Sequence, residues 1–561
     1  MGTLTASLLF AGALLCQVPA PVPAPQQPGE PTVKPEDKCS VEGTVLNVQT
    51  GEPLKKAHVN LTPIQSQKFN STSWGAVTDA AGRFLIDEVD PGKYRFSADR
   101  NGFVQMEYQA KAPGKSGSLL TLSKGQKLTD VVFRMTPHGV ISGKVVDEDG
   151  EPLAGAGIMV MRHTYENGKR TLSSEGNAST NDRGEYRAYG IAPGKYFVCL
   201  SYDRSFGMQQ VEIRKEGSED GYVPTFYPNV SRSAQASQVE VTAGNEVSGI
   251  DFRLTPVHTA RVTGRITNPG PGLRGLASVS LMPRDSGLAW AMMKDAIAGD
   301  KGNFQFRNVA PGSYTLTAQS FMNGGTEPQT AAAVVEVGDS NVDGIQLTFG
   351  AASEISGTVT ADKGLDLKNR GMMIMLSPEE TKMTMGLRPG QVQDDGTFKL
   401  KVPTPDRYSV NVYPMPEGCY VKSIRYGDTE YPNGVIDLSK GANGGELTIT
   451  IVPNGGQIDG TVKDSNDQMA GTATVVLVPD QRDLHSLYDV ARLDQNGHFT
   501  IKGVKPGKYK LFAWDDVEQG QYEDPDFLRP FEDKGEEIEV HGGDKSTKDL
   551  KLIVAGDASD N

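Results

Sequence analysis

One pattern recurs five times along this chain of 561 residues, and it limits the fold more than any other feature. Each copy opens with a short alternating segment that has a glycine near its centre. About forty residues later come a turn and an aromatic residue, and ten residues after that come a second turn and a tyrosine. Such repetition indicates successive copies of one structural unit. The glycines are Gly43, Gly143, Gly264, Gly357 and Gly460, the aromatics are Phe84, Tyr186, Phe304, Phe398 and Phe499, and the tyrosines are Tyr94, Tyr196, Tyr314, Tyr408 and Tyr509.

The turns and the segments between them predict short β-strands. In the turn from Asp79 to Gly82, the aspartate side chain can accept hydrogen bonds from the following backbone, and glycine can adopt a positive φ. The Pro-Gly pair before most of the tyrosines supplies the next reversal. Beyond Tyr94, the residues Phe96 and Ala98 share its face, which is the period of a half-buried strand. Strands at this spacing predict an all-β fold.

The repeat spacing predicts five tandem Ig-like or prealbumin-like antiparallel β-sandwiches. Gly and Pro number 64 and 34, which suits turn-dense β structure and stays below the level of low-complexity disorder. We expect the sandwiches to occupy residues 38–137, 138–257, 258–351, 352–454 and 455–556.

The segment before the repeats predicts export. An apolar run from Leu4 to Leu15 precedes small residues that suit a signal peptidase, so residues 1–20 are expected to be a signal peptide. Residues 21–37 are rich in proline and are expected to form an extended linker. We therefore expect a location in the periplasm, at the outer surface or outside the cell. Lipid attachment at Cys16 and free secretion both stay open.

Net charge, hydropathy and cysteine content exclude several properties of the chain. The formal net charge of −14 removes the electrostatic attraction that nucleic-acid binding needs. Beyond the first 20 residues no apolar run is long enough for a transmembrane helix. Apart from Cys16, the cysteines are Cys39, Cys199 and Cys419. Each falls in a different repeat, so the sequence predicts no disulfide within a repeat.

The repeats resemble a known family, the carboxypeptidase regulatory-like domain. The segments Gly51-Glu-Pro-Leu-Lys-Lys-Ala57 and Gly150-Glu-Pro-Leu-Ala-Gly-Ala156 are similar to its signature, as are the turn–aromatic and Pro-Gly-x-Tyr motifs. The five copies extend over residues 38–555. The resemblance implies a transthyretin-like or prealbumin-like sandwich, grouped with carbohydrate-binding-like folds and related to the Cna-B repeat. It also implies a non-catalytic module, since the family is named for a domain beside a carboxypeptidase unit.

The sequence predicts no enzyme. The five repeats leave no room for a catalytic domain, and His163 and Glu166, the ends of one H-x-x-E segment, are expected to be ordinary strand or loop positions. We predict no catalytic residues, no metal ligands and no cofactor. The acidic segment 515–540 is expected to be a solvated loop, with calcium binding left open.

Three functions stay open. The first is a non-catalytic structural, adhesion or binding array with other envelope proteins as partners. The second, implied by the resemblance, is binding of polysaccharide, and the third is regulation of a partner hydrolase. Sugars stack on exposed aromatic rings, whereas most large aromatics pack inside proteins. The candidate glycan-stacking residues are Trp74, Trp290, Trp514, Tyr222, Phe226 and Tyr227.

Overall fold

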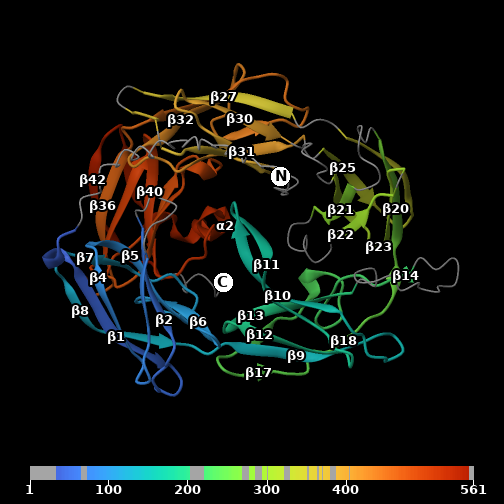
Figure 1. Ribbon diagram of the computed structural model, residues 1–561, viewed down its shortest axis with the longest axis horizontal. Coiled ribbons are helices and arrows are strands. Elements are labelled where there is room, and N and C mark those ends of the chain that lie inside the picture. Colours follow the sequence, from blue (N-terminus) through green and yellow to red (C-terminus); the bar gives the residue numbers. More distant parts are fainter. Residues whose placement is uncertain are drawn as a thin grey trace, which may run out of the picture.

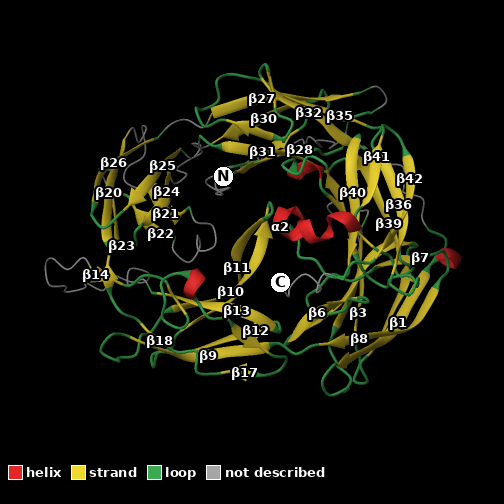
Figure 2. Cartoon of the chain, turned by 180° about the vertical axis from the view of Figure 1, so that it is seen from behind, coloured by secondary structure: helices red, strands yellow, loops and turns green. Residues whose placement is uncertain are grey.

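The computed structural model is built from β-sheets, and the chain curves into a ring (Figure 1). The same ring is seen from behind in Figure 2. None of the helices in the described ranges has the length and apolar character that a membrane crossing requires. The structure describes residues 33–64, 73–202, 220–267, 277–284, 293–299, 301–320, 329–349, 353–362, 365–368, 370–379, 387–402 and 405–554. The predicted signal peptide lies outside these ranges, as does most of the predicted linker.

The first sandwich has two sheets that enclose an apolar core, in which Phe96 and Val59 have no exposed surface. It follows the short helix η1 (Pro35–Asp37). The smaller sheet has the order β4 (Arg83–Val89), β1 (Cys39–Asn47), β8 (Lys127–Met135). The larger has the order β3 (Trp74–Val77), β2 (His58–Pro63), β5 (Gly92–Arg100), β6 (Phe103–Glu107), and β7 (Leu119–Leu122) also pairs with β5.

The second sandwich repeats this plan and carries one long hairpin. Its smaller sheet has the order β12 (Glu185–Ile191), β9 (Gly139–Val146), β17 (Glu246–Val247), and β18 (Phe252–Arg253) also pairs with β9. Its larger sheet has the order β11 (Lys169–Ser179), β10 (Gly157–Glu166), β13 (Gly194–Ser201), β15 (Thr225–Phe226), and β16 (Val239–Val241) also pairs with β13. The helix η2 (Ser233–Gln235) follows β15 in the chain, and the strands β14 (Asp220–Gly221) and β19 (Val257–His258) form a separate two-stranded sheet.

The third and fourth sandwiches continue around the ring. In the third, the smaller sheet has the order β23 (Asn303–Val309), β20 (Ala260–Thr267), β26 (Val342–Thr348). Its larger sheet has the order β22 (Lys294–Ile297), β21 (Ala277–Pro283), β24 (Gly312–Ser320), β25 (Thr330–Val337). In the fourth, one sheet has the order β30 (Thr397–Val402), β27 (Ser353–Ala361), β35 (Leu447–Val452), β32 (Tyr420–Tyr426), β33 (Thr429–Glu430). The other sheet has the order β29 (Gly390–Gln391), β28 (Met373–Pro378), β31 (Arg407–Tyr413), β34 (Val435–Asp437).

The fifth sandwich brings the ring back to the first (Figure 1). Its sheets have the orders β39 (His498–Val504), β36 (Gly456–Lys463), β42 (Lys545–Lys551) and β38 (Asp489–Arg492), β37 (Thr474–Pro479), β40 (Gly507–Trp514), β41 (Glu536–Val540). Between β40 and β41 lies an insert with the helices η5 (Gln521–Glu523), α2 (Pro525–Leu528) and η6 (Arg529–Lys534), and η4 (His485–Leu487) precedes β38.

The predicted all-β sandwich architecture is confirmed, with one difference in strand direction. Neighbouring strands are mostly antiparallel, but each opening strand lies parallel to the strand that closes its repeat. The pairs are β1 with β8, β9 with β17 and β18, β20 with β26, β27 with β35, and β36 with β42. Each opening strand therefore lies between an antiparallel and a parallel neighbour, which period-two alternation alone does not reveal.

The repeated glycine and the repeated aromatic are direct cross-strand partners. Gly357, for example, pairs with Phe398, and a Cβ added to Gly357 would lie 2.6 Å from the carbonyl oxygen of Leu447 and still closer to the Phe398 ring. Real Cβ atoms do not approach so closely, so only glycine lets the ring lie over the strand. The five pairs are Gly43–Phe84, Gly143–Tyr186, Gly264–Phe304, Gly357–Phe398 and Gly460–Phe499.

The repeated tyrosine fixes the turn that precedes it. The hydroxyl of Tyr94 donates a 2.6 Å hydrogen bond to the carbonyl of Asp90, and Tyr509 donates a 2.7 Å bond to the carbonyl of Lys505. Burial, reinforced by the charge of Asp90, raises the pKa of Tyr94 to about 12, so this donor keeps its proton. The aspartate turn also behaves as expected, since Asp79 Oδ1 accepts hydrogen bonds from two backbone N–H groups.

Candidate functional site: contacts between the sandwiches

Two of the six aromatics predicted to stack with sugars are packed inside the protein. Trp514 and Phe226 have no exposed surface. The interpretation of these two residues as ligand platforms is therefore wrong, because neither presents a ring face to solvent. Phe226 lies in a small cluster with Met161, Phe197 and Cys199.

Trp514 points out of the sandwich core, as its position in the strand predicts, but the insert covers it. Its ring stacks on Phe512 at 5.0 Å, and Phe531 of the insert lies 5.9 Å away, edge to face. The expectation that residues 515–540 form a solvated loop is also wrong. Tyr522, Leu528 and Phe531 are buried there, so the segment keeps its acidic groups outside and its apolar groups against the sheet.

The other four candidates do not gather at one place. The Trp74 ring is half-buried and lies edge-on to Tyr94 at 5.6 Å. The half-buried Tyr222 lies 5.9 Å from Tyr202, and its hydroxyl donates to Glu148. Tyr227 is half-buried against Phe252 at 6.3 Å, whereas Trp290 lies outside the described residues.

Sequence reasoning missed the two most exposed aromatic side chains among the described residues. Tyr189 on β12 is 74% exposed, and Tyr413 on β31 is 51% exposed. Alternation would have signalled Tyr189, because it follows the buried Tyr186 by an odd number of residues. Among the described residues these two rings therefore offer more exposed aromatic surface than the half-buried Trp74.

No histidine or cysteine feature forms a catalytic or metal centre in the described parts. His163 lies on β10, and its ring packs edge-on against Phe197 at 5.1 Å. Burial lowers the pKa of His163, with Arg170 adding to the effect, so the ring stays neutral. Within the described ranges, no group of three or more His, Cys, Asp or Glu side chains is placed to hold a metal ion. Cys39, Cys199 and Cys419 are free and buried.

The first and fifth sandwiches meet through backbone hydrogen bonds. Leu119 of β7 donates its N–H to the carbonyl of Leu493 at 2.9 Å, and its carbonyl accepts from the N–H of Gln495 at 3.1 Å. The Gln495 side chain then bonds both backbone groups of Thr121, at 2.9 and 2.8 Å. Ser118 donates to the carbonyl of Gly471. This junction extends a sheet edge across two sandwiches that lie far apart in sequence.

A half-buried ion pair reinforces the junction of the first and fifth sandwiches. Arg492 lies 2.8 Å from Glu107, and their side chains are 27% and 20% exposed. The same Glu107 oxygen accepts from the backbone N–H of Gly117 at 2.8 Å, so the carboxylate is held from two sides. Lys115 also pairs with Asp516 at 2.9 Å. Pairs that share a network and exclude water contribute more than isolated surface pairs.

The long β10–β11 hairpin of the second sandwich reaches across the ring to the fifth (Figure 1). Its tip is Asn167-Gly168, both with positive φ, as a two-residue hairpin turn requires. A Cβ on Gly168 would lie 2.5 Å from the carbonyl oxygen of Glu523, and one on Gly520 would lie 3.0 Å from that of Tyr165. Two glycines thus permit close backbone contact between the hairpin and η5 of the insert.

The remaining junctions use fewer bonds. The Gln49 amide donates to the carbonyl of Ala243 at 2.7 Å between the first and second sandwiches. Between the fourth and fifth, Lys502 pairs with Glu417 at 2.5 Å, and Gly455 donates its N–H to the carbonyl of Gly418 at 2.9 Å. The fifth sandwich therefore contacts the first, second and fourth.

Comparison with family models identifies the first sandwich. Residues 40–136 match the carboxypeptidase regulatory-like domain. The first sandwich is therefore similar to a carboxypeptidase regulatory-like domain. Residues 457–547, in the fifth sandwich, match a different model, domain II of polysaccharide lyase family 4. The model matched by the first sandwich describes a regulatory-like rather than a catalytic domain, which agrees with the expectation of a non-catalytic module.

Comparison with known proteins adds local similarity to bacterial surface proteins. A search of curated proteins finds no match. A minor pilin of Streptococcus agalactiae is 14% identical, covering 40% of this chain and 97% of that one, with a TM-score of 0.23. Two B repeats of the collagen binding protein of Staphylococcus aureus are 11% identical, covering 74% and 99%, with a TM-score of 0.13.

Proposed function

We propose that this chain is an exported, non-catalytic scaffold of five independently folding sandwiches, which presents binding surfaces at the cell envelope. The backbone pairing of Leu119 with Leu493 and Gln495 carries the proposal, because it joins the first sandwich to the fifth. A chain that served only as a flexible spacer would gain nothing from this closure. A closed array instead holds the outer surfaces of its modules in fixed relative positions.

Other observations support a scaffold that works outside the cytoplasm. The first sandwich is a regulatory-like rather than a catalytic domain. The predicted signal peptide and proline linker would place the ring at some distance from an attachment point. The surface charge is strongly negative, which favours solubility over association with nucleic acid or anionic lipid.

Fractionation of the producing cells tests the location, and sequencing of the mature N-terminus tests the cleavage. We expect the chain in the envelope or medium, beginning after residue 20. Recovery of an uncleaved chain from the cytoplasm would overturn export. Limited proteolysis tests the modules, with protected fragments expected to begin and end near residues 137, 257, 351 and 454.

Glycan binding is the second candidate, because exposed aromatic faces are present. Tyr189 is 74% exposed, Trp74 is half-buried at the sheet edge, and the model matched by the fifth sandwich comes from polysaccharide lyases. We expect Tyr189→Ala or Trp74→Ala to weaken polysaccharide retention in affinity electrophoresis. The control Tyr202→Ala, which removes a half-buried ring elsewhere on the second sandwich, is expected to leave retention unchanged. Equal retention of all variants, or none by the parent chain, would exclude these platforms.

A further inference from the structure

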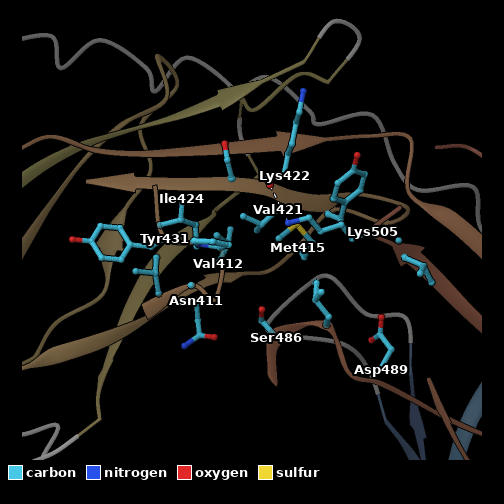
Figure 3. Close-up of a pocket in the computed structure, with 18 of the residues that line it drawn as sticks. Asn411, Val412, Met415, Val421, Lys422, Ile424, Tyr431, Ser486, Asp489 and Lys505 are labelled. Atoms are coloured by element: carbon cyan, nitrogen blue, oxygen red, sulfur yellow. Dashed lines mark hydrogen bonds between the residues drawn. The ribbon is translucent and has the colours of Figure 1, made fainter. Parts of the chain in front are cut away.

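A cavity of about 260 Å³ lies where the fourth sandwich meets the fifth, and it is shown in Figure 3. From the fourth sandwich come residues of β31 and β32, which belong to opposite sheets. The cavity therefore opens between these two sheets, at an edge of the fourth sandwich. From the fifth come η4, the start of β38 and the turn between β39 and β40, which form the opposite wall.

The wall formed by the fourth sandwich is apolar. Val412, Met415 and Val421 are half-buried, and Ile424 is buried behind them. In Figure 3 these side chains gather at the centre of the cavity, whereas the Lys422 amine points away from them. An apolar floor with a few polar groups at its edge is the usual composition of a small-molecule site, and the volume lies slightly below the usual range of that class.

Asp489, at the start of β38, supplies a carboxylate to this cavity. The residue is exposed at the mouth, yet burial of its carboxyl group raises the pKa to about 6. Within the described residues its carboxylate has no hydrogen bond or ion pair, and the buried hydroxyl of Tyr509 is a neighbouring group. A partly desolvated carboxylate without a cation is unfavourable unless a ligand provides one.

Lys505, in the turn before β40, supplies an amine from the same wall. Its Nζ donates a 3.0 Å hydrogen bond to the carbonyl of Lys422, which is a neutral partner. Burial lowers the pKa of Lys505, and the charge of Glu430 only partly offsets this effect. Asp489 and Lys505 form no ion pair, so the two opposite charges of the cavity do not satisfy one another.

We propose that this cavity binds a small zwitterion with an apolar body, of the class of apolar amino acids and dipeptides. The ligand's ammonium lies at Asp489, its carboxylate lies at Lys505, and its apolar side chain lies on Val412, Met415 and Val421. Such a ligand supplies both missing counter-charges and covers the apolar floor in one step. The inference does not depend on the scaffold function or on export.

Calorimetric titration of the full chain with L-leucyl-L-leucine and two blocked forms tests the charge pattern. N-acetyl-L-leucyl-L-leucine lacks the ammonium, and L-leucyl-L-leucine amide lacks the carboxylate. At neutral pH we expect the free dipeptide to bind at least about tenfold more tightly than either blocked form. Equal affinities for the three probes, or no heat from the free dipeptide at millimolar concentration, would overturn the proposal.

Matched variants assign each charge. Asp489→Asn is expected to weaken binding of the free dipeptide and of the amide about tenfold and to leave binding of the N-acetyl form unchanged. Lys505→Gln is expected to weaken binding of the free dipeptide and of the N-acetyl form and to leave binding of the amide unchanged. The controls Asp483→Asn and Lys508→Gln change exposed residues of the same sandwich outside the cavity. Loss of binding to all probes alike would contradict the assignment.

A cavity-filling variant separates this site from any other. Met415→Trp adds a large ring to the apolar floor and is expected to abolish binding of the free dipeptide. Near-ultraviolet circular dichroism shows whether each variant keeps its packing. If a folded Met415→Trp chain still binds the dipeptide as tightly as the parent, the ligand lies elsewhere and the proposal fails.

Discussion

The fifth sandwich meets two neighbours in different ways. Against the first, Leu119 makes two backbone hydrogen bonds, the Gln495 amide bonds both backbone groups of Thr121, and Arg492 pairs with Glu107. Against the fourth, a few bonds surround a cavity of about 260 Å³. One kind of module thus forms both a closed seam and an open cleft.

The difference shows what decides between structure and binding at such a junction. At the junction with the first sandwich, the polar side chains near the backbone hydrogen bonds are themselves paired, as Arg492 is with Glu107. At the junction with the fourth sandwich, which has fewer bonds, Asp489 and Lys505 form no ion pair with one another. Unsatisfied polar groups next to apolar surface are what a ligand recognises.

The largest effect is expected from a substitution that destabilises the fifth sandwich itself, and with it both junctions. In Gly460→Ala, the new methyl group collides with the carbonyl of Lys548 and with the Phe499 ring. We expect a loss of about 3 kcal/mol in the free energy of unfolding of the fifth sandwich. Thermal denaturation measures it, with Gly471→Ala as control because nothing lies within 4 Å of its added Cβ. Similar melting of the two variants would refute the glycine–aromatic explanation.

The next change opens the seam and leaves the cleft. Gln495→Ala removes two hydrogen bonds to Thr121, so we expect docking of the first on the fifth sandwich to weaken by about 1–3 kcal/mol. Small-angle scattering should then show a larger radius of gyration, with Gln481→Ala as an exposed control. An unchanged radius in a double variant with Arg492→Ala would contradict a seam that depends on these contacts.

A smaller effect is expected where the hairpin touches the insert. Gly168→Ala introduces a side chain at φ +70 and a contact of 2.5 Å with Glu523. We expect a cost of about 1–2 kcal/mol and faster hydrogen exchange in η5. Gly155→Ala has a similar φ but open space around it, so it should alter local stability without changing exchange in η5.

The smallest expected effect is a pH dependence at the cleft. Because burial raises the pKa of Asp489 to about 6, above that of the unfolded chain, its ionised form disfavours folding. Stability from this group is full below about pH 4 and is lost as the pH rises through 6. Asp489→Asn should therefore raise the melting temperature at pH 8 and leave it nearly unchanged at pH 4. A rise of equal size at both pH values would show that the carboxylate is not desolvated.

Much of the local structure could be predicted because single residues determine it. The Asp79 turn and the buried alternation after Tyr94 each follow from one side chain's chemistry. The recurring spacing between Gly43 and Phe84 served only to recognise the repeat. The structure supplies its cause, which is a ring lying over a bare backbone.

The contacts between modules could not be predicted, because they depend on residues without any periodic signal. Nothing in the sequence marks Leu119 or Gln495 as partners. The burial of Trp514 was missed for a related reason, since the segment that covers it is acidic overall and hides only a few apolar residues such as Phe531. Pattern reasoning finds what repeats, and each of these features occurs once.

The pairing of the first and fifth sandwiches changes how the protein responds to damage. In an open string of modules, one proteolytic cut in a connecting segment releases everything beyond it. Here a single cut leaves the two pieces held together at Leu119 and Leu493, so separation requires both a broken peptide bond and a parted seam.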